Sequence, residues 1–113
     1  MRKGARAVIV GICALLFPGL ATAAAGWTGD VKVVELIPSG KHYYEIRLKL
    51  GSNPSGCREK EWFYINYDAR GADEMFDLLV EGIKSELRLR VYVTGVCNLH
   101  GYSEISSVSA SPN

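Results

Sequence analysis

The pattern of apolar and polar positions predicts three strands in the first half of the chain. Residues 31–37 (VKVVELI) are rich in β-branched side chains, and residues 42–50 (HYYEIRLKL) alternate between apolar and polar side chains, as a half-buried strand does. The intervening PSGK at 38–41 has the proline and glycine of a tight turn, so we expect these two strands to pair as a hairpin. After a loop at 51–60, the aromatic-rich residues 61–67 (EWFYINY) predict a third strand.

Over residues 68–87 the spacing of apolar residues changes to that of a helix. Apolar side chains recur there on one helical face, at Met75, Phe76, Leu79, Val80 and Ile83. Gly82 interrupts this helix and indicates a close packing contact. Residues 87–97 (LRLRVYVTGVC) alternate again and place Cys97 in phase with the apolar side, and a weaker alternation over 102–109 predicts a fifth strand.

The order of these elements is three strands, one helix and two strands. This is the element order of an OB-fold, a small five-stranded barrel. We therefore expect an all-β domain with a single helix, whose apolar face covers the open end of the barrel.

The first 25 residues have the three parts of a secretory signal peptide. MRKGAR is basic, AVIVGICALLF is apolar but too short to span a membrane, and ATAAAG offers small residues for cleavage. Cleavage after Ala23 or Ala25 fits this pattern, and we favour Ala25. The prediction is a signal peptide at 1–25, carrying Cys13 as an ordinary apolar residue, and one secreted or periplasmic domain at 26–113.

Removal of this segment changes the charge of the protein. Of 13 basic residues, the signal peptide carries Arg2, Lys3 and Arg6, so 10 remain against 12 acidic residues and the net charge is near −2. A slightly acidic chain argues against binding to nucleic acid, which requires clustered Lys and Arg. The remaining chain has no second apolar run, so no membrane span is expected.

Two cysteines, Cys57 and Cys97, remain after cleavage. An even number of cysteines in an oxidising compartment predicts one disulfide, which closes a loop of about 40 residues. The alternative is a pair of free thiols or half of a metal site, but zinc needs four ligands and only His42 and His100 are left to assist. We expect no metal and no cofactor.

The sequence shows no recognisable catalytic constellation. Both cysteines are expected to be bridged, and no serine–histidine–aspartate spacing surrounds the two histidines, His42 and His100. The GSNPSG stretch at 51–56 lacks the lysine and the strand-to-helix context of a phosphate-binding loop. We therefore expect a protein that is not an enzyme.

Aromatic residues are the stronger indication of function. An aromatic ring offers an apolar platform for a sugar, and a tyrosine hydroxyl adds a polar group. The candidate ligand-binding residues are Tyr43, Trp62, Tyr92, Asn98, His100 and Tyr102. Ordinary strand propensity, edge packing and turn chemistry are the alternative explanations for these residues. The pattern also leaves open whether Trp62 and Tyr64 or Phe63 and Ile65 face the core.

Polar positions of the second and fourth predicted strands carry a set of basic residues, Arg47, Lys49, Arg88 and Arg90. If these strands lie near each other, the set forms a basic stripe. Such a stripe would pair with acidic residues of a neighbouring subunit or attract sialylated or sulfated glycans; a solvated face is the alternative.

Several segments resemble the B subunits of AB5-type bacterial toxins. GWTGD at 26–30 and DEMFDLLVEGIKSELRLRVYV at 73–93 resemble the B subunits of subtilase cytotoxin and typhoid toxin. GDVKVVEL at 29–36 and LRVYVTGVCNLHGYSEISSV at 89–108 look like the Shiga toxin B subunit. These patches together cover most of residues 26–113.

The resemblance implies an OB-fold subunit that assembles into a homopentamer, binds cell-surface glycans and partners a toxin A subunit. The cysteine positions differ from those of these families, so no sugar-contact residue is transferred from them. A monomeric secreted or periplasmic interaction protein of the same fold, without lectin or toxin activity, is the alternative.

Overall fold

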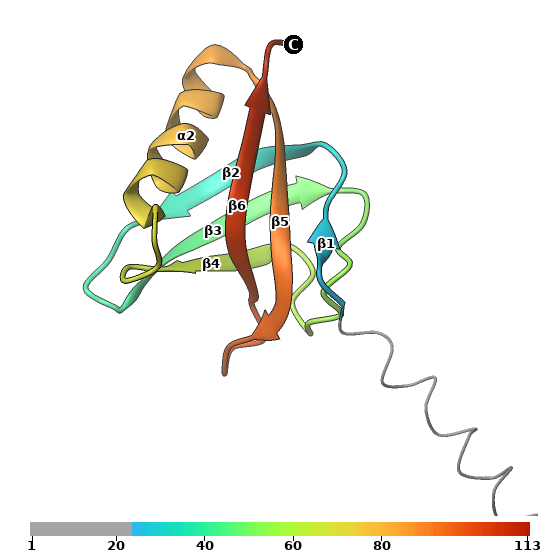
Figure 1. The fold of residues 1–113 in the computed structure, drawn as a ribbon, viewed down its shortest axis with the longest axis vertical. Helices are drawn as coiled ribbons and strands as arrows, with labels where there is room; N and C mark the ends of the chain where they lie inside the picture. Colours follow the sequence, from blue (N-terminus) through green and yellow to red (C-terminus); the bar gives the residue numbers. More distant parts are fainter. Residues whose placement is uncertain (1–23) are drawn as a thin grey trace, which may run out of the picture.

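The computed structural model describes residues 24–113, which form one mixed sheet and one helix (Figure 1). Residues 1–23 of the predicted signal peptide, with Cys13, lie outside the described residues. The elements are β1 (Gly26–Trp27), β2 (Val31–Ile37), β3 (Tyr43–Leu50), β4 (Trp62–Asn66), α2 (Ala72–Ser85), β5 (Arg88–Cys97) and β6 (Ser103–Ser111). Within residues 24–113 there is no helix with the length and apolar character that a membrane crossing requires.

The expectation of a mostly β domain with one helix and one disulfide is confirmed. All five predicted strands are present, but the sheet has six strands rather than five. The additional strand, β1, contains only two residues, which is too short for any periodicity to show in the sequence. It pairs antiparallel with β5, with Gly26 opposite Val93.

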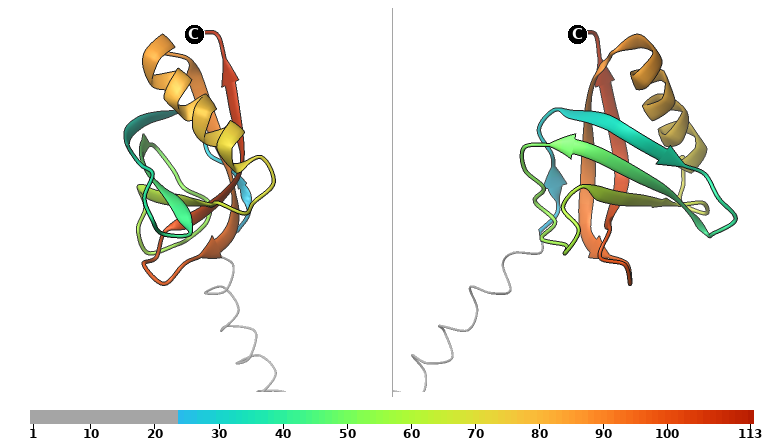
Figure 2. Two further views of the ribbon diagram at one scale, coloured as in Figure 1. Left: turned by 90° about the vertical axis from the view of Figure 1, so that its left-hand side faces the viewer. Right: turned by 180° about the vertical axis from the view of Figure 1, so that it is seen from behind.

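The strand pairings form a closed circuit of five strands, β2, β3, β4, β6 and β5. β2, β3 and β4 form an antiparallel meander, and β4 then pairs with β6 in parallel. β6 pairs antiparallel with β5, and β5 meets β2 where Val31 lies opposite Leu89. The views from the side and from behind show β5 and β6 crossing the direction of β2, β3 and β4, with α2 at one end (Figure 2).

Large apolar side chains fill the interior between the strands. The fully buried residues include Ile46, Leu48, Phe63, Ile65, Leu79, Val91, Val93 and Ile105. Phe63 and Ile65 are therefore the inward pair of β4. The predicted helical face is wrong at Ile83, which is 51% exposed; the residues of α2 that are buried are Ala72, Leu79 and Gly82.

The disulfide joins Cys57 to Cys97 with their Cα atoms 5.7 Å apart, as predicted. Cys57 is buried, whereas Cys97 is exposed, so the expectation that Cys97 extends the buried side of its strand is wrong. The alternation ends earlier because Gly95 has a φ of 90° and the β5–β6 register shifts between Val93 and Cys97. The bridge fastens the loop before β4 to the end of β5.

Candidate functional site

The outward side chains of β3, β4 and β6 gather on one surface. Register places Arg47 opposite Trp62, and Glu45 opposite Tyr64, which in turn lies opposite Glu104. Because alternate residues of a strand share a face, these rows lie next to each other on the outside of the sheet. We call this surface the aromatic face; it comprises Tyr43, Glu45, Arg47, Trp62, Tyr64, Asn66, Tyr102 and Glu104.

A stacked pair of rings lies at one end of the aromatic face. The rings of Trp62 and Tyr102 are nearly parallel, at 18°, with centroids 5.4 Å apart. The guanidinium of Arg47 lies 5.9 Å from the Trp62 ring centroid, and the His100 ring lies 5.6 Å from that of Tyr102. Since both stacked rings are only half-buried, they offer partly exposed apolar surface bordered by polar groups.

A nearly buried carboxylate lies beside this stack. Glu45 points outward from β3, yet it is only 8% exposed. Tyr64, opposite it, is also buried, and the Tyr43 ring meets the Tyr64 ring edge-on at 5.6 Å. The Lys41 ammonium donates a hydrogen bond of 2.8 Å to Glu45, which raises the pKa of the lysine. Glu45 is therefore largely shielded from water, although it lies on the outer side of the sheet.

The phenols of Tyr64 and Tyr102 remain protonated at neutral pH. Burial raises the pKa of Tyr64, and the nearby Glu104 adds to this effect. Burial likewise raises the pKa of Tyr102, with a further contribution from Glu45. Each hydroxyl group can thus donate a hydrogen bond as well as accept one.

Glu104 is held in place by two neighbours. It accepts hydrogen bonds from Thr94 Oγ1 at 2.7 Å and from Asn66 Nδ2 at 3.1 Å. These bonds fix a second carboxylate on the aromatic face and connect β4, β5 and β6 at this point.

The structure brings most of the sequence-predicted candidates together. Tyr43, Trp62 and Tyr102 lie on the aromatic face, and His100 lies at its edge. Asn98 instead shapes the loop beneath them, because its Oδ1 accepts hydrogen bonds from the backbone N–H groups of His100 and Tyr102. This is the turn chemistry that the sequence left as the alternative for residues 98–102.

Tyr92 lies away from these residues, on β5. Its ring meets that of Trp27 edge-on at 5.5 Å, and the Arg90 guanidinium lies 4.8 Å from the Trp27 ring centroid. Tyr92 therefore belongs to a second aromatic cluster, which is built from β1 and β5.

Sequence reasoning did not select Glu45, Tyr64 or Glu104 as site residues. A glutamate on the polar side of an alternating strand is typically solvated, so nothing in the local pattern marks Glu45. The relevant signal is the cross-strand position of Tyr64, which becomes readable only when the register is known.

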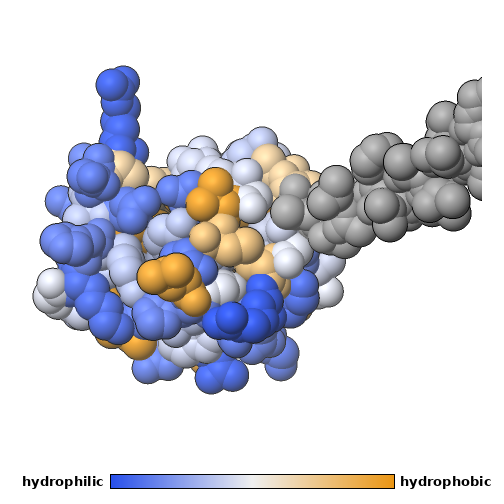
Figure 3. Space-filling model, turned by 90° about the horizontal axis from the view of Figure 1, so that it is seen from below, coloured by the Kyte–Doolittle hydropathy of each residue, from blue (hydrophilic) through white to orange (hydrophobic). Residues whose placement is uncertain are grey.

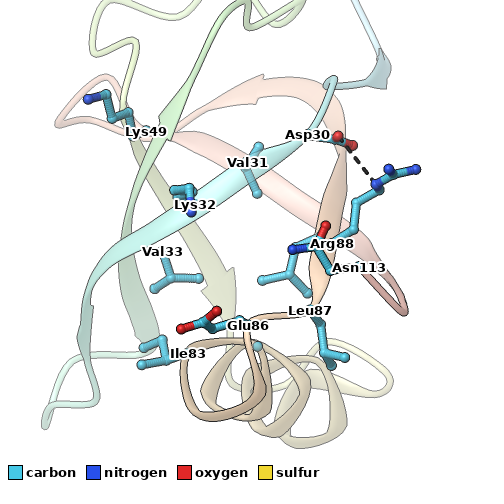
Figure 4. A pocket seen from close by; sticks show the side chains of 12 residues that line it. Asp30, Val31, Lys32, Val33, Lys49, Ile83, Glu86, Leu87, Arg88 and Asn113 are labelled. Carbon is cyan, nitrogen blue, oxygen red and sulfur yellow. Dashed lines mark ion pairs between the residues drawn. The ribbon is translucent and has the colours of Figure 1, made fainter.

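A groove of about 440 Å³ runs between β2 and the end of α2 (Figure 4). Its charged residues carry both signs, and Asp30 and Arg88 form an ion pair of 3.6 Å across it. Lys49 also lines this groove, whereas Arg47 and Arg90 lie over separate tryptophans. Because β2 separates β3 from β5, the four basic residues do not form a continuous stripe.

Elsewhere, apolar residues on the face seen in Figure 3 form small separate patches among hydrophilic ones. Within residues 24–113, no group of three or more His, Cys, Asp or Glu side chains is arranged to hold a metal ion. In comparisons with known proteins, neither a protein-family model nor a curated protein matches the chain. The candidate site accordingly rests on the geometry of the aromatic face.

Proposed function

We propose that this protein is a secreted, non-catalytic glycan-binding subunit with an OB-fold, and that the aromatic face binds the sugar. The closed circuit of β2, β3, β4, β6 and β5, with a parallel β4–β6 pair and the helix between β4 and β5, supports this fold. The two-residue β1 is then an addition along β5. OB-folds bind oligosaccharides and oligonucleotides on their second and third strands and the two flanking loops, which correspond here to β3, β4 and residues 38–42 and 98–102.

The stacked pair of Trp62 and Tyr102 carries this proposal. The two half-exposed rings are stacked nearly parallel, so the ring surface that the stack leaves exposed provides an apolar platform against which one face of a pyranose can pack. Carboxylate, guanidinium and phenol groups around the stack supply acceptors and donors for sugar hydroxyls. Two carboxylates, Glu45 and Glu104, disfavour the phosphates of an oligonucleotide, so a sugar fits this face better than a nucleic acid.

The resemblance to toxin B subunits supports a ring of five copies, cell-surface glycans as ligands and a toxin A subunit as a partner. One shallow site binds a sugar weakly, and several copies on one ring raise the avidity. The signal-peptide pattern and the Cys57–Cys97 disulfide support an extracytoplasmic location, because disulfides persist in oxidising compartments. A monomeric interaction protein of the same fold is the second candidate.

The test begins with the full chain, expressed with its leader and purified after processing. Light scattering is expected to give about five times the monomer mass, and a monomer would favour the second candidate. A glycan array then identifies ligands for wild type, Trp62→Ala and Trp27→Ala. Trp62→Ala should lose most of the binding, about tenfold or more, whereas Trp27→Ala, in the β1–β5 cluster, should retain it. Absence of glycan binding, or full binding by a folded Trp62→Ala variant, would contradict the proposal.

A further inference from the structure

The ion pair between Glu45 and Lys41 is unequal in its exposure. The Glu45 side chain is 10% exposed, whereas that of Lys41 is 53% exposed and projects from the turn between β2 and β3. A carboxylate removed from water needs a compensating positive charge. Among the described residues, Lys41 is the one cation within ion-pair distance of Glu45. The positive charge that compensates Glu45 is therefore carried by a long, half-exposed side chain that can move into solvent.

Tyrosine side chains lie near this ion pair, while the Lys41 ammonium itself stays about half exposed. Tyr43 and Tyr64 meet at 67°, so their rings form two walls of a corner beside Glu45. The pKa of Lys41 is raised mainly by its hydrogen bond to Glu45, and the nearby hydroxyls of Tyr43 and Tyr102 add to this effect. A carboxylate flanked by aromatic rings is the surrounding that suits an ammonium ion, through charge-assisted hydrogen bonds and cation–π attraction.

We propose that Glu45, Tyr43 and Tyr102 form an ammonium subsite, which Lys41 fills in the free protein and which the amino group of a ligand sugar fills in the complex. This inference rests on the proposed function and narrows its ligand class to glycans that contain a free, non-acetylated amino sugar. Lys41 is then a displaceable internal substitute for the ligand's amine.

The subsite and the ring stack are close enough to hold one sugar. Glu45 and Arg47 are two residues apart on β3, and Trp62 lies opposite Arg47. Two residues of a strand span about 7 Å, which a pyranose ring with its amino group bridges. Tyr102 borders both places, since it stacks on Trp62 and interacts with Glu45.

The charges on the aromatic face favour a cationic sugar over an anionic one. Glu45 and Glu104 both point outward on this face. The nearest guanidinium, that of Arg47, already pairs with Glu61 at 3.5 Å and lies over Trp62. A sialic acid or a sulfate group would be repelled by these two carboxylates. An ammonium group would instead find an acceptor, Glu45, to which it can donate in place of Lys41.

The test compares two oligosaccharides that differ only in whether their amino groups are free or acetylated. Calorimetry in mildly acidic buffer measures the affinity of the processed protein for a glucosamine oligomer and for the matching N-acetylglucosamine oligomer. The wild type should prefer the amine form about tenfold, the lower range for a charge-assisted hydrogen bond. In Glu45→Gln the preference should fall to about one, and in Lys41→Ala it should rise several-fold because the competing amine is gone.

Controls separate the subsite from overall charge. Glu74→Gln and Lys84→Ala change the net charge by the same amounts at exposed positions of α2, and both should keep the wild-type preference. Lys41 lies on an exposed turn, so Lys41→Ala tests the idea even if Glu45→Gln does not fold. Equal affinity of the wild type for both oligomers, with loss of both in Trp62→Ala, would overturn the ammonium subsite but keep the glycan proposal. Absence of binding to these oligomers and to every arrayed glycan would overturn both.

Discussion

Gly82 of α2 lies directly against the side chain of Leu89 at the start of β5: a Cβ atom at position 82 would be 2.4 Å from Leu89 Cδ1 and 3.0 Å from Cγ. Leu89 belongs to the core and is 2% exposed. In an exposed helix, alanine is more stable than glycine by about 1 kcal/mol. The glycine is therefore explained by space, because it lets α2 pack closely on β5.

Gly82→Ala should consequently destabilise the protein in spite of the gain in helix propensity. Overpacking of a filled core costs about 1–3 kcal/mol, and urea denaturation with an unchanged m-value measures this difference. Gly51→Ala is the matched control, since no atom lies within 4 Å of a Cβ at that position. A Gly82→Ala variant as stable as the wild type would show that Leu89 can move aside.

The disulfide is expected to contribute a large part of the stability. Cys57 and Cys97 are 40 residues apart in the sequence, and cross-linking a loop of that length stabilises by about 4 kcal/mol in the chain-entropy model. The double variant Cys57→Ala/Cys97→Ala should lower the free energy of unfolding by roughly this amount. Mass spectrometry after alkylation without reductant provides the check on the wild type. Two alkylated thiols in the folded protein would contradict the bridge.

The strands and the helix could be predicted because apolar residues recur with a different period in each kind of element. The alternation of residues 42–50 correctly separates Ile46 and Leu48, which are buried, from Arg47 and Lys49, which are exposed. Where the period is broken, prediction failed. The bulge near Gly95 turned Cys97 outward. Ile83 is in phase with the apolar stripe of the helix, yet it is 51% exposed near the end of α2.

The candidate site could be predicted only in part, because it depends on long-range pairing. Tyr43, Trp62 and Tyr102 were selected for their chemistry, and they do lie on one face. Their shared neighbour Glu45 became visible only through its register with Tyr64. Tyr92 has the same chemistry on a similar strand, yet β5 lies elsewhere in the sheet. Residue type alone does not distinguish these two clusters.

A buried polar network connects the loop before β4 to β6. Ser103 Oγ lies 2.6 Å from Ser55 Oγ and accepts a hydrogen bond of 3.0 Å from Asn53 Nδ2. Both serines are fully buried, so Ser103→Ala would remove a buried hydrogen-bond partner of Ser55 Oγ, which would keep only its bond from the Cys57 N–H. We expect a loss of about 1–3 kcal/mol, measured by urea denaturation. Ser106→Ala, at an exposed position of the same strand, should change stability little; an equal effect of both substitutions would contradict the network.

The hydrogen bond between Tyr44 and Asp73 predicts a stability contribution that disappears in alkali. Tyr44 donates its hydroxyl to Asp73 Oδ1 at 2.5 Å, and its ring stacks on Phe76. This bond is the main cause that raises the pKa of Tyr44 from 10.0 to about 12. The folded state therefore holds the phenol proton more tightly than the unfolded state. The contribution is fully present below pH 10 and is lost as the pH rises towards 12.

Tyr44→Phe should accordingly be less stable than the wild type at neutral pH, by about 1 kcal/mol, and the difference should shrink above pH 10. Phenolate absorbance gives an independent readout. Above pH 10, the folded wild type should absorb little more than Tyr44→Phe until the pH approaches 12, because the Tyr44 phenol still keeps its proton over most of this range. Asp73→Asn removes the charged acceptor and should restore earlier ionisation of Tyr44. If the stability difference between wild type and Tyr44→Phe stayed constant through this range, Tyr44 would not be the group that titrates.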